Sequence, residues 1–348
     1  MGFNLSIKAL VPGVLLLLAC AGSLAATPAA GRLYVSDERG GEVVIVDAGS
    51  GEITGRVAVG KRPRGMRLAP DGRHLYVALS GSAIAGPGVD ESSLPPPDRR
   101  FDGIGVIDLK TGKLQKTLPG GTDPETLAVS PDGRTLYVAN EDGMQLTSID
   151  VATGITRGRV SIGVEPEGVA VRPDGKLVYV TCEGAGAVYA IDTQSMQVIA
   201  KIPTRPRPRA MVFARDGRLG FISDEIGAAI TVFDTATQLV VHTIALPASS
   251  DTLLRPMGLA TTPDGKSLYV TTGRGGALLE IEIGSMTVKR NIKGIGQRPW
   301  GLALNSEGTK AYTANGPSGD ISMIDLASGR VERRVHVGDS PWGMVFHQ

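Results

Sequence analysis

Cysteine and histidine are scarce in this sequence. Two of its 348 residues are cysteine, four are histidine, and no Cys-x-x-Cys-His motif occurs. Two cysteines cannot build a disulfide scaffold, a cysteine-rich zinc module or an iron–sulfur site, and the missing motif excludes covalently attached haem. His74 and His242 are isolated, and His336 and His347 lie in the C-terminal region, so the spacing indicates no metal-binding trio. We therefore expect no metal site and no cofactor.

The chain also has almost no net charge. It contains 36 basic and 35 acidic residues, a formal charge of +1. This balance argues against a nucleic-acid partner and against a basic membrane-binding patch. Glycine accounts for 47 residues, about twice the usual share of ~7%. No helical periodicity is sustained over three turns, and short β-branched runs separated by Gly, Pro, Asp and Asn are typical of strands and tight turns.

Residues 1–25 have the layout of a secretory signal peptide. One positive charge precedes an apolar stretch, and Ser23-Leu24-Ala25 supplies the small residues of a cleavage site. The alternative is a lipoprotein signal, because Leu17-Leu18-Ala19-Cys20 approximates a lipobox and would place a lipid on Cys20. We expect a periplasmic protein; the alternative is an outer-membrane lipoprotein that faces the periplasm. Membrane association is expected only if Cys20 is lipidated.

From Gly31 onward the sequence repeats one pattern. A turn such as Pro131-Asp132-Gly133 is followed by a strand with an aromatic residue, a second strand ending in an acidic residue, and a second turn such as Asp150-x-x-Thr-Gly. The aromatic position recurs at intervals of 42, 61, 42, 42, 48 and 43 residues, at Tyr34, Tyr76, Tyr137, Tyr179, Phe221, Tyr269 and Tyr312. This period is typical of four-stranded propeller blades. We expect these aromatic side chains to pack between blades.

The two ends of the repeat region complement each other. Residues 341–348 match the first strand of a repeat, whereas Leu33-Tyr34-Val35 is a second strand that lacks a first one. The N- and C-terminal strands are therefore predicted to close one blade together, which leaves no free sheet edge. The fold class is all-β: one seven-bladed β-propeller domain over residues 31–348. Cys182, left without a disulfide partner, is expected to be a buried thiol; a reactive thiol would need exposure and a lowered pKa.

Three repeats identify a family resemblance. Tyr137-Val138-Ala139-Asn140, Tyr179-Val180-Thr181-Cys182 and Tyr312-Thr313-Ala314-Asn315 resemble the Tyr-Val-Thr-Asn repeat of YVTN-family β-propellers. Among these, the chain looks most like the exported propellers associated with PQQ-dependent catabolism. That resemblance implies an accessory protein of an alcohol oxidation system, whose partners would be a periplasmic PQQ dehydrogenase, a cytochrome c or a transporter component.

The geometry of a propeller places a candidate site on one face. Both long insertions, Ser80 to Asp102 and Leu246 to Leu254, fall on the face where the inner strands begin. Proline-centred triplets converge on the channel mouth there, and they carry the predicted ligand- or partner-binding residues Arg62, Arg64, Glu165, Glu167, Arg207, Arg209, Arg255, Arg298, Trp300 and Trp342. These side chains either form ion pairs that pin neighbouring blades, or form a funnel for an anionic or quinone-like molecule. Because arginines outnumber acids in the triplets, we expect an anion.

The sequence contains none of four common site motifs: the nucleophile elbow, the zinc-protease helix, the phosphate-binding loop and the dinucleotide-binding fingerprint. We therefore expect a non-enzymatic binding or scaffold propeller without catalytic residues. The alternative is a lactone or ester hydrolase that works at the channel mouth through carboxylates such as Glu165, Glu167 and Asp123.

Overall fold

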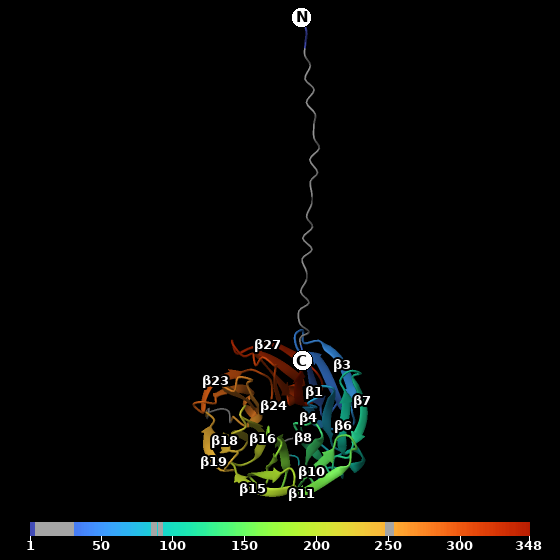
Figure 1. The fold of residues 1–348 in the computed structure, drawn as a ribbon, viewed down its shortest axis with the longest axis vertical. Coiled ribbons are helices and arrows are strands. Elements are labelled where there is room, and N and C mark those ends of the chain that lie inside the picture. Colours follow the sequence, from blue (N-terminus) through green and yellow to red (C-terminus); the bar gives the residue numbers. More distant parts are fainter. Residues whose placement is uncertain (4–30, 85–88, 90–92, 248–253) are drawn as a thin grey trace.

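The structure is a computed structural model that describes residues 1–3, 31–84, 89, 93–247 and 254–348. These residues form seven four-stranded antiparallel sheets, arranged as blades around a central axis (Figure 1). The prediction of a seven-bladed β-propeller is confirmed. The predicted leader and Cys20 lie outside the described residues. Within the described ranges, no helix is long and apolar enough to cross a membrane.

Each blade contributes one strand to each of four concentric rings. The inner strands are β28 (Pro341–His347), β4 (Pro63–Leu68), β8 (Pro124–Val129), β12 (Pro166–Val171), β16 (Pro208–Phe213), β20 (Pro256–Thr261) and β24 (Pro299–Leu304). The second strands are β1 (Arg32–Asp37), β5 (His74–Leu79), β9 (Thr135–Asn140), β13 (Leu177–Cys182), β17 (Leu219–Asp224), β21 (Ser267–Thr272) and β25 (Lys310–Asn315).

The outer half of each blade has the same regularity. The third strands are β2 (Glu42–Asp47), β6 (Gly103–Asp108), β10 (Gln145–Asp150), β14 (Ala187–Asp192), β18 (Ala229–Asp234), β22 (Ala277–Glu282) and β26 (Asp320–Asp325). The outer strands are β3 (Ile53–Ala58), β7 (Lys113–Leu118), β11 (Thr156–Ser161), β15 (Gln197–Pro203), β19 (Val240–Ala245), β23 (Thr287–Lys293) and β27 (Arg330–His336). The described residues include the 3₁₀ turns η2 (Arg99–Phe101), η3 (Gly273–Gly275) and η4 (Gly316–Ser318).

Short side-chain hydrogen bonds set the turns between the third and outer strands. At the end of β10, the backbone N–H of Thr153 donates to Asp150 Oδ1 at 2.7 Å, and Gly154 takes the left-handed conformation with φ of 72°. The N–H donation from Thr153, with further hydrogen bonds from the Thr153 hydroxyl and Arg157, lowers the pKa of Asp150 to about 2. These turns, like the Pro-Asp-Gly turns, lie on the face where the inner strands end, called the far face below, and they are short in every blade.

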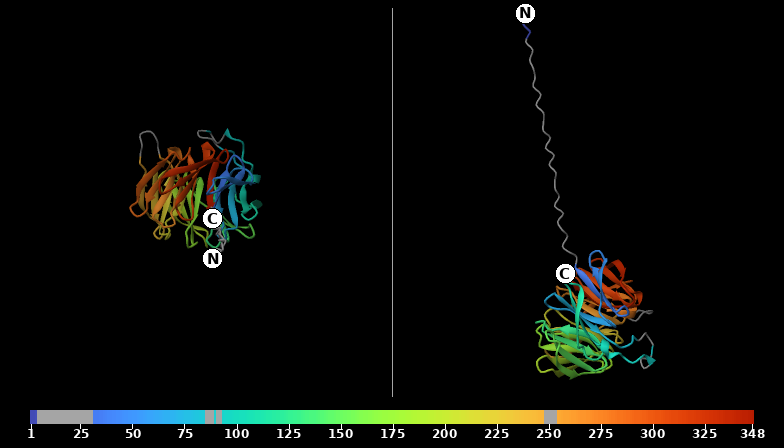
Figure 2. Two further views of the ribbon diagram at one scale, coloured as in Figure 1. Left: turned by 90° about the horizontal axis from the view of Figure 1, so that it is seen from above. Right: turned by 90° about the vertical axis from the view of Figure 1, so that its right-hand side faces the viewer.

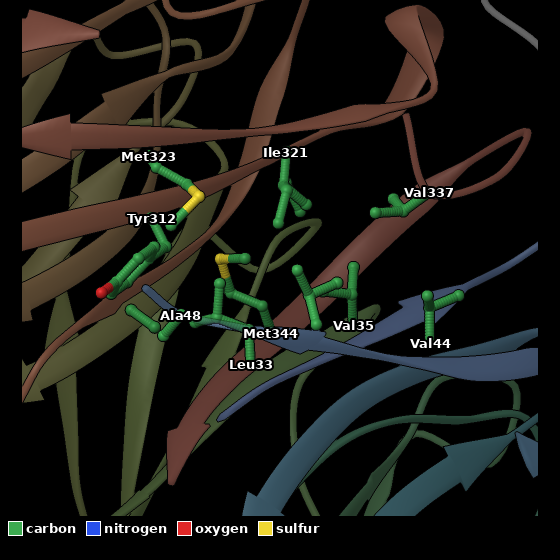
Figure 3. Close-up of a cluster of buried hydrophobic side chains, with 12 residues drawn as sticks. Leu33, Val35, Val44, Ala48, Tyr312, Ile321, Met323, Val337 and Met344 are labelled. Carbon is green, nitrogen blue, oxygen red and sulfur yellow. The ribbon is translucent and has the colours of Figure 1, made fainter. Parts of the chain in front are cut away.

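The termini close the ring as the repeat pattern predicts. The C-terminal β28 pairs antiparallel with β1, with Leu33 opposite Phe346, and completes the sheet β28-β1-β2-β3. Figure 3 shows the side chains that join this blade to the preceding one: Leu33, Val35 and Met344 meet Tyr312 and Met323 in one buried cluster. The closing blade therefore belongs to the same continuous ring of cores as the other six.

The aromatic positions of the repeat are buried between blades, as expected. Each of Tyr34, Tyr76, Tyr137, Tyr179, Phe221, Tyr269 and Tyr312 is at most 4% exposed. Cys182 is fully buried on β13, and burial raises the pKa of its thiol to about 12. The prediction of a buried thiol is confirmed, and the raised pKa disfavours the nucleophilic thiolate near neutral pH.

Candidate functional site

The channel mouth lies where the inner strands begin. It holds a cavity of about 510 Å³, lined mainly by charged side chains from several blades. Of the long insertion between β5 and β6, the described residues Ser82, Ala83, Val89, Leu94, Pro95 and Pro97 also line it. Figure 2 shows this insertion, in cyan, projecting on the face opposite the C-terminus. The predicted placement of the first insertion is therefore confirmed for those residues; most of the second lies outside the described ranges.

The backbone is strained at five points around this mouth. Where the inner strand begins with proline, the preceding residue has a positive φ in Arg62 (45°), Asp123 (52°), Glu165 (52°), Arg207 (63°) and Arg298 (51°). Left-handed conformations are costly for residues with a Cβ, and strain of this kind is concentrated at functional sites. The repetition at five blades shows that the fold imposes this conformation, and it places all five residues at the rim.

The first charged cluster surrounds Arg64, which is 5% exposed. Its guanidinium contacts Glu125 of the next blade, which is fully buried, and lies 3.6 Å from Glu141 Oε2. Its other face lies over the Trp342 ring, 5.2 Å from the centroid. Arg62 donates from Nε to Glu38 Oε1 at 2.9 Å. In this half of the rim, paired charges and the contact of Arg64 with Trp342 link the inner strands β28, β4 and β8.

A matching cluster surrounds Arg209 on the other side. Arg209 contacts Glu183, and its Nη2 lies 3.2 Å from Glu167 Oε1. The neighbouring Arg207 donates from Nε to Glu183 Oε2 at 2.6 Å and lies 3.4 Å from Glu225 Oε2. The predicted inter-blade pairs, Arg64 with Glu125 and Glu167 with Arg209, are both present. Four of the predicted arginines therefore serve to pin blades.

The prediction that arginines outnumber acidic residues at the mouth is wrong. The residues lining the mouth include six arginines and seven acidic residues. The additional acids follow the second strand of four blades, at Glu38, Glu141, Glu183 and Glu225, and three of them line the cavity. The signal was present in the sequence as a glutamate directly after the repeat strand, in Asp37-Glu38, Asn140-Glu141, Cys182-Glu183 and Asp224-Glu225.

Two of the predicted residues at the mouth have no ion-pair partner among the described residues. Glu165 is exposed and makes no salt bridge, and a Cβ at Gly184 would come within 3.2 Å of its Oε2, so glycine leaves room for the carboxylate. Arg298 is partly buried with its guanidinium over the Trp300 ring, 5.0 Å from the centroid. Burial, and then the nearby Arg274 and Arg209, lower the pKa of Arg298 against the attraction of Glu225. Among the predicted residues, the mouth thus holds one carboxylate and one guanidinium without an ion pair; Arg274, which also lines the cavity, is a further arginine without a salt bridge in the described structure.

The inner-strand order shows how these two groups face each other. Going round the ring, β12 and β24 are separated by β16 and β20 on one side and by β28, β4 and β8 on the other. Glu165 precedes β12 and Arg298 precedes β24, so they lie on opposite sides of the axis. Trp300 and Trp342 meet edge to face beneath them, with ring centroids 5.5 Å apart. Arg255, also predicted for the site, does not line the mouth cavity.

No group of three or more His, Cys, Asp or Glu side chains in the described ranges is arranged to hold a metal ion.

Two family models match parts of this chain. Residues 165–344, more than half of the chain, match the lactonase, 7-bladed beta-propeller family, and residues 100–224 match the cytochrome D1 heme domain. A curated relative, Antigen Lp49 of Leptospira interrogans, is 32% identical over an alignment of 107 residues that covers 22% of this chain and 24% of that protein. The chain spans about a quarter of the length of the curated relatives it matches.

Two solved structures illustrate the shared fold. The periplasmic gluconolactonase PpgL of Pseudomonas aeruginosa superposes with a TM-score of 0.74 at 23% identity, over 91% of this chain and 99% of that one. A candidate 6-phosphogluconolactonase from Bacteroides fragilis gives 0.73 at 17% identity, over 93% and 99%. At these identities the superpositions establish the propeller fold.

These comparisons overturn the predicted function. A non-enzymatic accessory propeller was expected because no local catalytic motif occurs, but a propeller site is assembled from residues in separate blades, so a short motif is not required. The family match favours the alternative, a lactone or ester hydrolase, over the scaffold. The chain belongs to the family of lactonase-type seven-bladed β-propellers.

Proposed function

We propose that this protein hydrolyses lactones at the channel mouth. The observation that carries the proposal is that two of the predicted groups there, Glu165 and Arg298, make no salt bridge and lie on opposite sides of one polar cavity of about 510 Å³. The other predicted charged residues that line the cavity are held in ion pairs, which leaves these two available for a ligand. Lactone hydrolysis needs a base to activate water and a cation to stabilise an oxyanion.

We assign a role to each group. Glu165 accepts a proton from a water molecule as that water adds to the lactone carbonyl carbon. Arg298 donates to the carbonyl oxygen as it becomes negative, and its partial burial beside Trp300 strengthens that interaction. The ring C–O bond then breaks, and Glu165 returns the proton to the leaving oxygen. The product is an open-chain hydroxy acid.

Replacement of Glu165 by glutamine tests this role. Glu165→Gln removes the base but keeps the size of the side chain, so we expect kcat/KM for gluconolactone to fall at least about 100-fold, the usual scale for a general base. The melting temperature should not change, because Glu165 makes no ion pair in the described structure. Glu52→Gln, an exposed glutamate on the opposite face, is the matched control and should retain activity. Activity of Glu165→Gln equal to that of the control would reject Glu165 as the base.

We further propose a periplasmic location, as the leader sequence predicts. Mass spectrometry of the exported protein should show a chain that begins near Ala26. A chain that begins at a diacylated Cys20 would instead indicate the lipoprotein alternative.

Association with a periplasmic PQQ dehydrogenase, a cytochrome c or a transporter component also stays a proposal from the family resemblance. It is chemically compatible with lactone hydrolysis, because oxidation of a cyclic hemiacetal yields a lactone. Co-purification from cells grown on alcohols tests it: enrichment of such a dehydrogenase with this protein is expected, and recovery at the level of an unrelated exported protein would contradict it.

A further inference from the structure

One arginine stands alone in the central channel, below the mouth. The fifth residue of each inner strand is alanine or valine in six blades, at Ala128, Ala170, Val212, Ala260, Ala303 and Val345. In the second blade, on β4, this position is Arg67. It lies three residues along the strand from Arg64 at the rim, which corresponds to about 10 Å at the usual strand rise.

Arg67 connects two cavities along the axis. The upper cavity, about 140 Å³, lies beneath the mouth and reaches Trp300 and Trp342. The lower one, about 350 Å³, opens toward the far face. The remaining lining of the lower cavity is apolar apart from one threonine: Leu68, Pro70, Ala128, Val129, Val169, Ala170, Val171, Met211, Val212, Phe213 and Thr261. Arg67 is its one charged lining residue in the described part of the chain.

This guanidinium has no counter-ion. Within the described ranges no carboxylate lies within 4 Å of it, and its one hydrogen bond runs from Nη1 to the carbonyl oxygen of Met66, at 2.8 Å. Its side chain is accessible from the channel, yet protein surrounds it on all sides, and this desolvation lowers the pKa of Arg67. Because the guanidinium is exposed to the channel and has no carboxylate partner, its charge is available to an anionic ligand. The other cationic side chains deep at the mouth, Arg64 and Arg209, each have glutamate partners.

We propose that Arg67 binds a small organic monocarboxylate in the central channel. A guanidinium presents two parallel N–H donors that match the two oxygens of a carboxylate. The single positive charge balances one negative charge, whereas a phosphate dianion would remain uncompensated. The walls formed by Ala128, Ala170 and Val212 suit a short hydrocarbon chain and disfavour a strongly hydrated inorganic anion. The site is separate from the pair Glu165 and Arg298, so it does not depend on lactone hydrolysis.

Calorimetric titration of the full chain with butyrate tests the site. Arg67→Ala reproduces the residue that four other blades have at this position, so the variant should fold, and loss of an unpaired charge should leave its melting temperature equal or higher. We expect butyrate affinity to fall at least tenfold in Arg67→Ala. Arg298→Gln, which changes an arginine of the mouth that makes no salt bridge, is the matched control and should bind butyrate as the parent does. Inorganic phosphate and chloride should bind more weakly than butyrate to the parent.

Two further measurements distinguish a carboxylate at Arg67 from one bound at the mouth. Methyl NMR of the parent should show butyrate-dependent shifts at Ala128 and Ala170, and lactone hydrolysis by Arg67→Ala should remain at the parental rate. Equal butyrate affinity in the parent and Arg67→Ala would overturn the proposal. Loss of binding only in Arg298→Gln would place the carboxylate at the mouth and overturn it as well. Chloride or phosphate binding tighter than butyrate would overturn the assigned ligand class.

Discussion

Asp224 differs from its counterparts in two other blades by the replacement of an amide with a carboxyl group. It ends β17, where Asn140 ends β9 and Asn315 ends β25. Thr231 donates to Asp224 Oδ2 at 2.6 Å, just as Thr147 donates to Asn140 Oδ1 at 2.6 Å. The side chain is fully buried, and its Oδ1 has no hydrogen-bond partner in the described structure. Burial raises the pKa of Asp224 to about 7, so the folded protein keeps this group protonated at mildly acidic pH.

This residue should make stability depend on pH. An exposed aspartate in the unfolded chain loses its proton near pH ~4, whereas the folded state holds it up to about pH 7. Between these values the folded state binds more protons, so the free energy of unfolding should fall as pH rises, by on the order of 2 kcal/mol from pH 5 to pH 7. Asp224→Asn should remove that fall. Urea unfolding at both pH values checks this, and parallel curves for parent and variant would contradict it.

Backbone strain at Glu165 leads to a separate prediction at this scale. Because its φ is 52°, Glu165→Gly should relieve strain and raise the free energy of unfolding by about 1 kcal/mol, while lactone hydrolysis is lost. Glu165→Ala also removes the carboxylate but keeps a Cβ, so it should lose hydrolysis without the gain in stability. Denaturant unfolding of the pair measures the difference. Equal stability of the two variants would show that the left-handed conformation carries no cost here.

At the level of strands, the sequence predicts the position of each strand and turn, but it does not predict which side chains pair between blades. The recurring turn and the aromatic strand predicted the blades, because turn chemistry and inter-blade burial act on neighbouring residues. The role of Glu183 was missed for the opposite reason: it meets Arg207 and Arg209 only after two blades have packed. Charge compensation at the mouth is a property of the closed ring, and counting charges within single triplets could not reveal it.

Removal of the closing strand β28 tests how much ring closure stabilises the fold. Deletion of residues 341–348 removes β28, including Met344, which is 6% exposed, and leaves the β1 edge unpaired. We expect a loss of about 4 kcal/mol or more and a melting temperature lower by ~10 °C. Deletion of Gln348 alone, beyond the end of β28, is the control and should have little effect. A truncated protein as stable as this control would contradict closure through β28.

For the whole molecule, the sequence predicts the fold correctly but not the function. Seven copies of one repeat predicted the propeller, since each blade must bury its faces against neighbours. The sequence predicts the mouth residues Glu165 and Arg298, but whether their charges are unpaired depends on which other charges pair once the ring has closed. The prediction of a non-enzymatic protein is wrong because a propeller can assemble a site from separate blades without a local motif, and residues 165–344 match the lactonase family.

The central claim is that a lactone binds between Glu165 and Arg298, and a crystal structure of Glu165→Gln soaked with gluconolactone tests it most directly. The variant should bind the substrate without hydrolysing it. We expect density for an intact lactone ring in the mouth, with its carbonyl oxygen within hydrogen-bond distance of the Arg298 guanidinium and its carbonyl carbon facing residue 165. An empty mouth at saturating lactone, or a lactone bound on the opposite face of the propeller, would contradict the account.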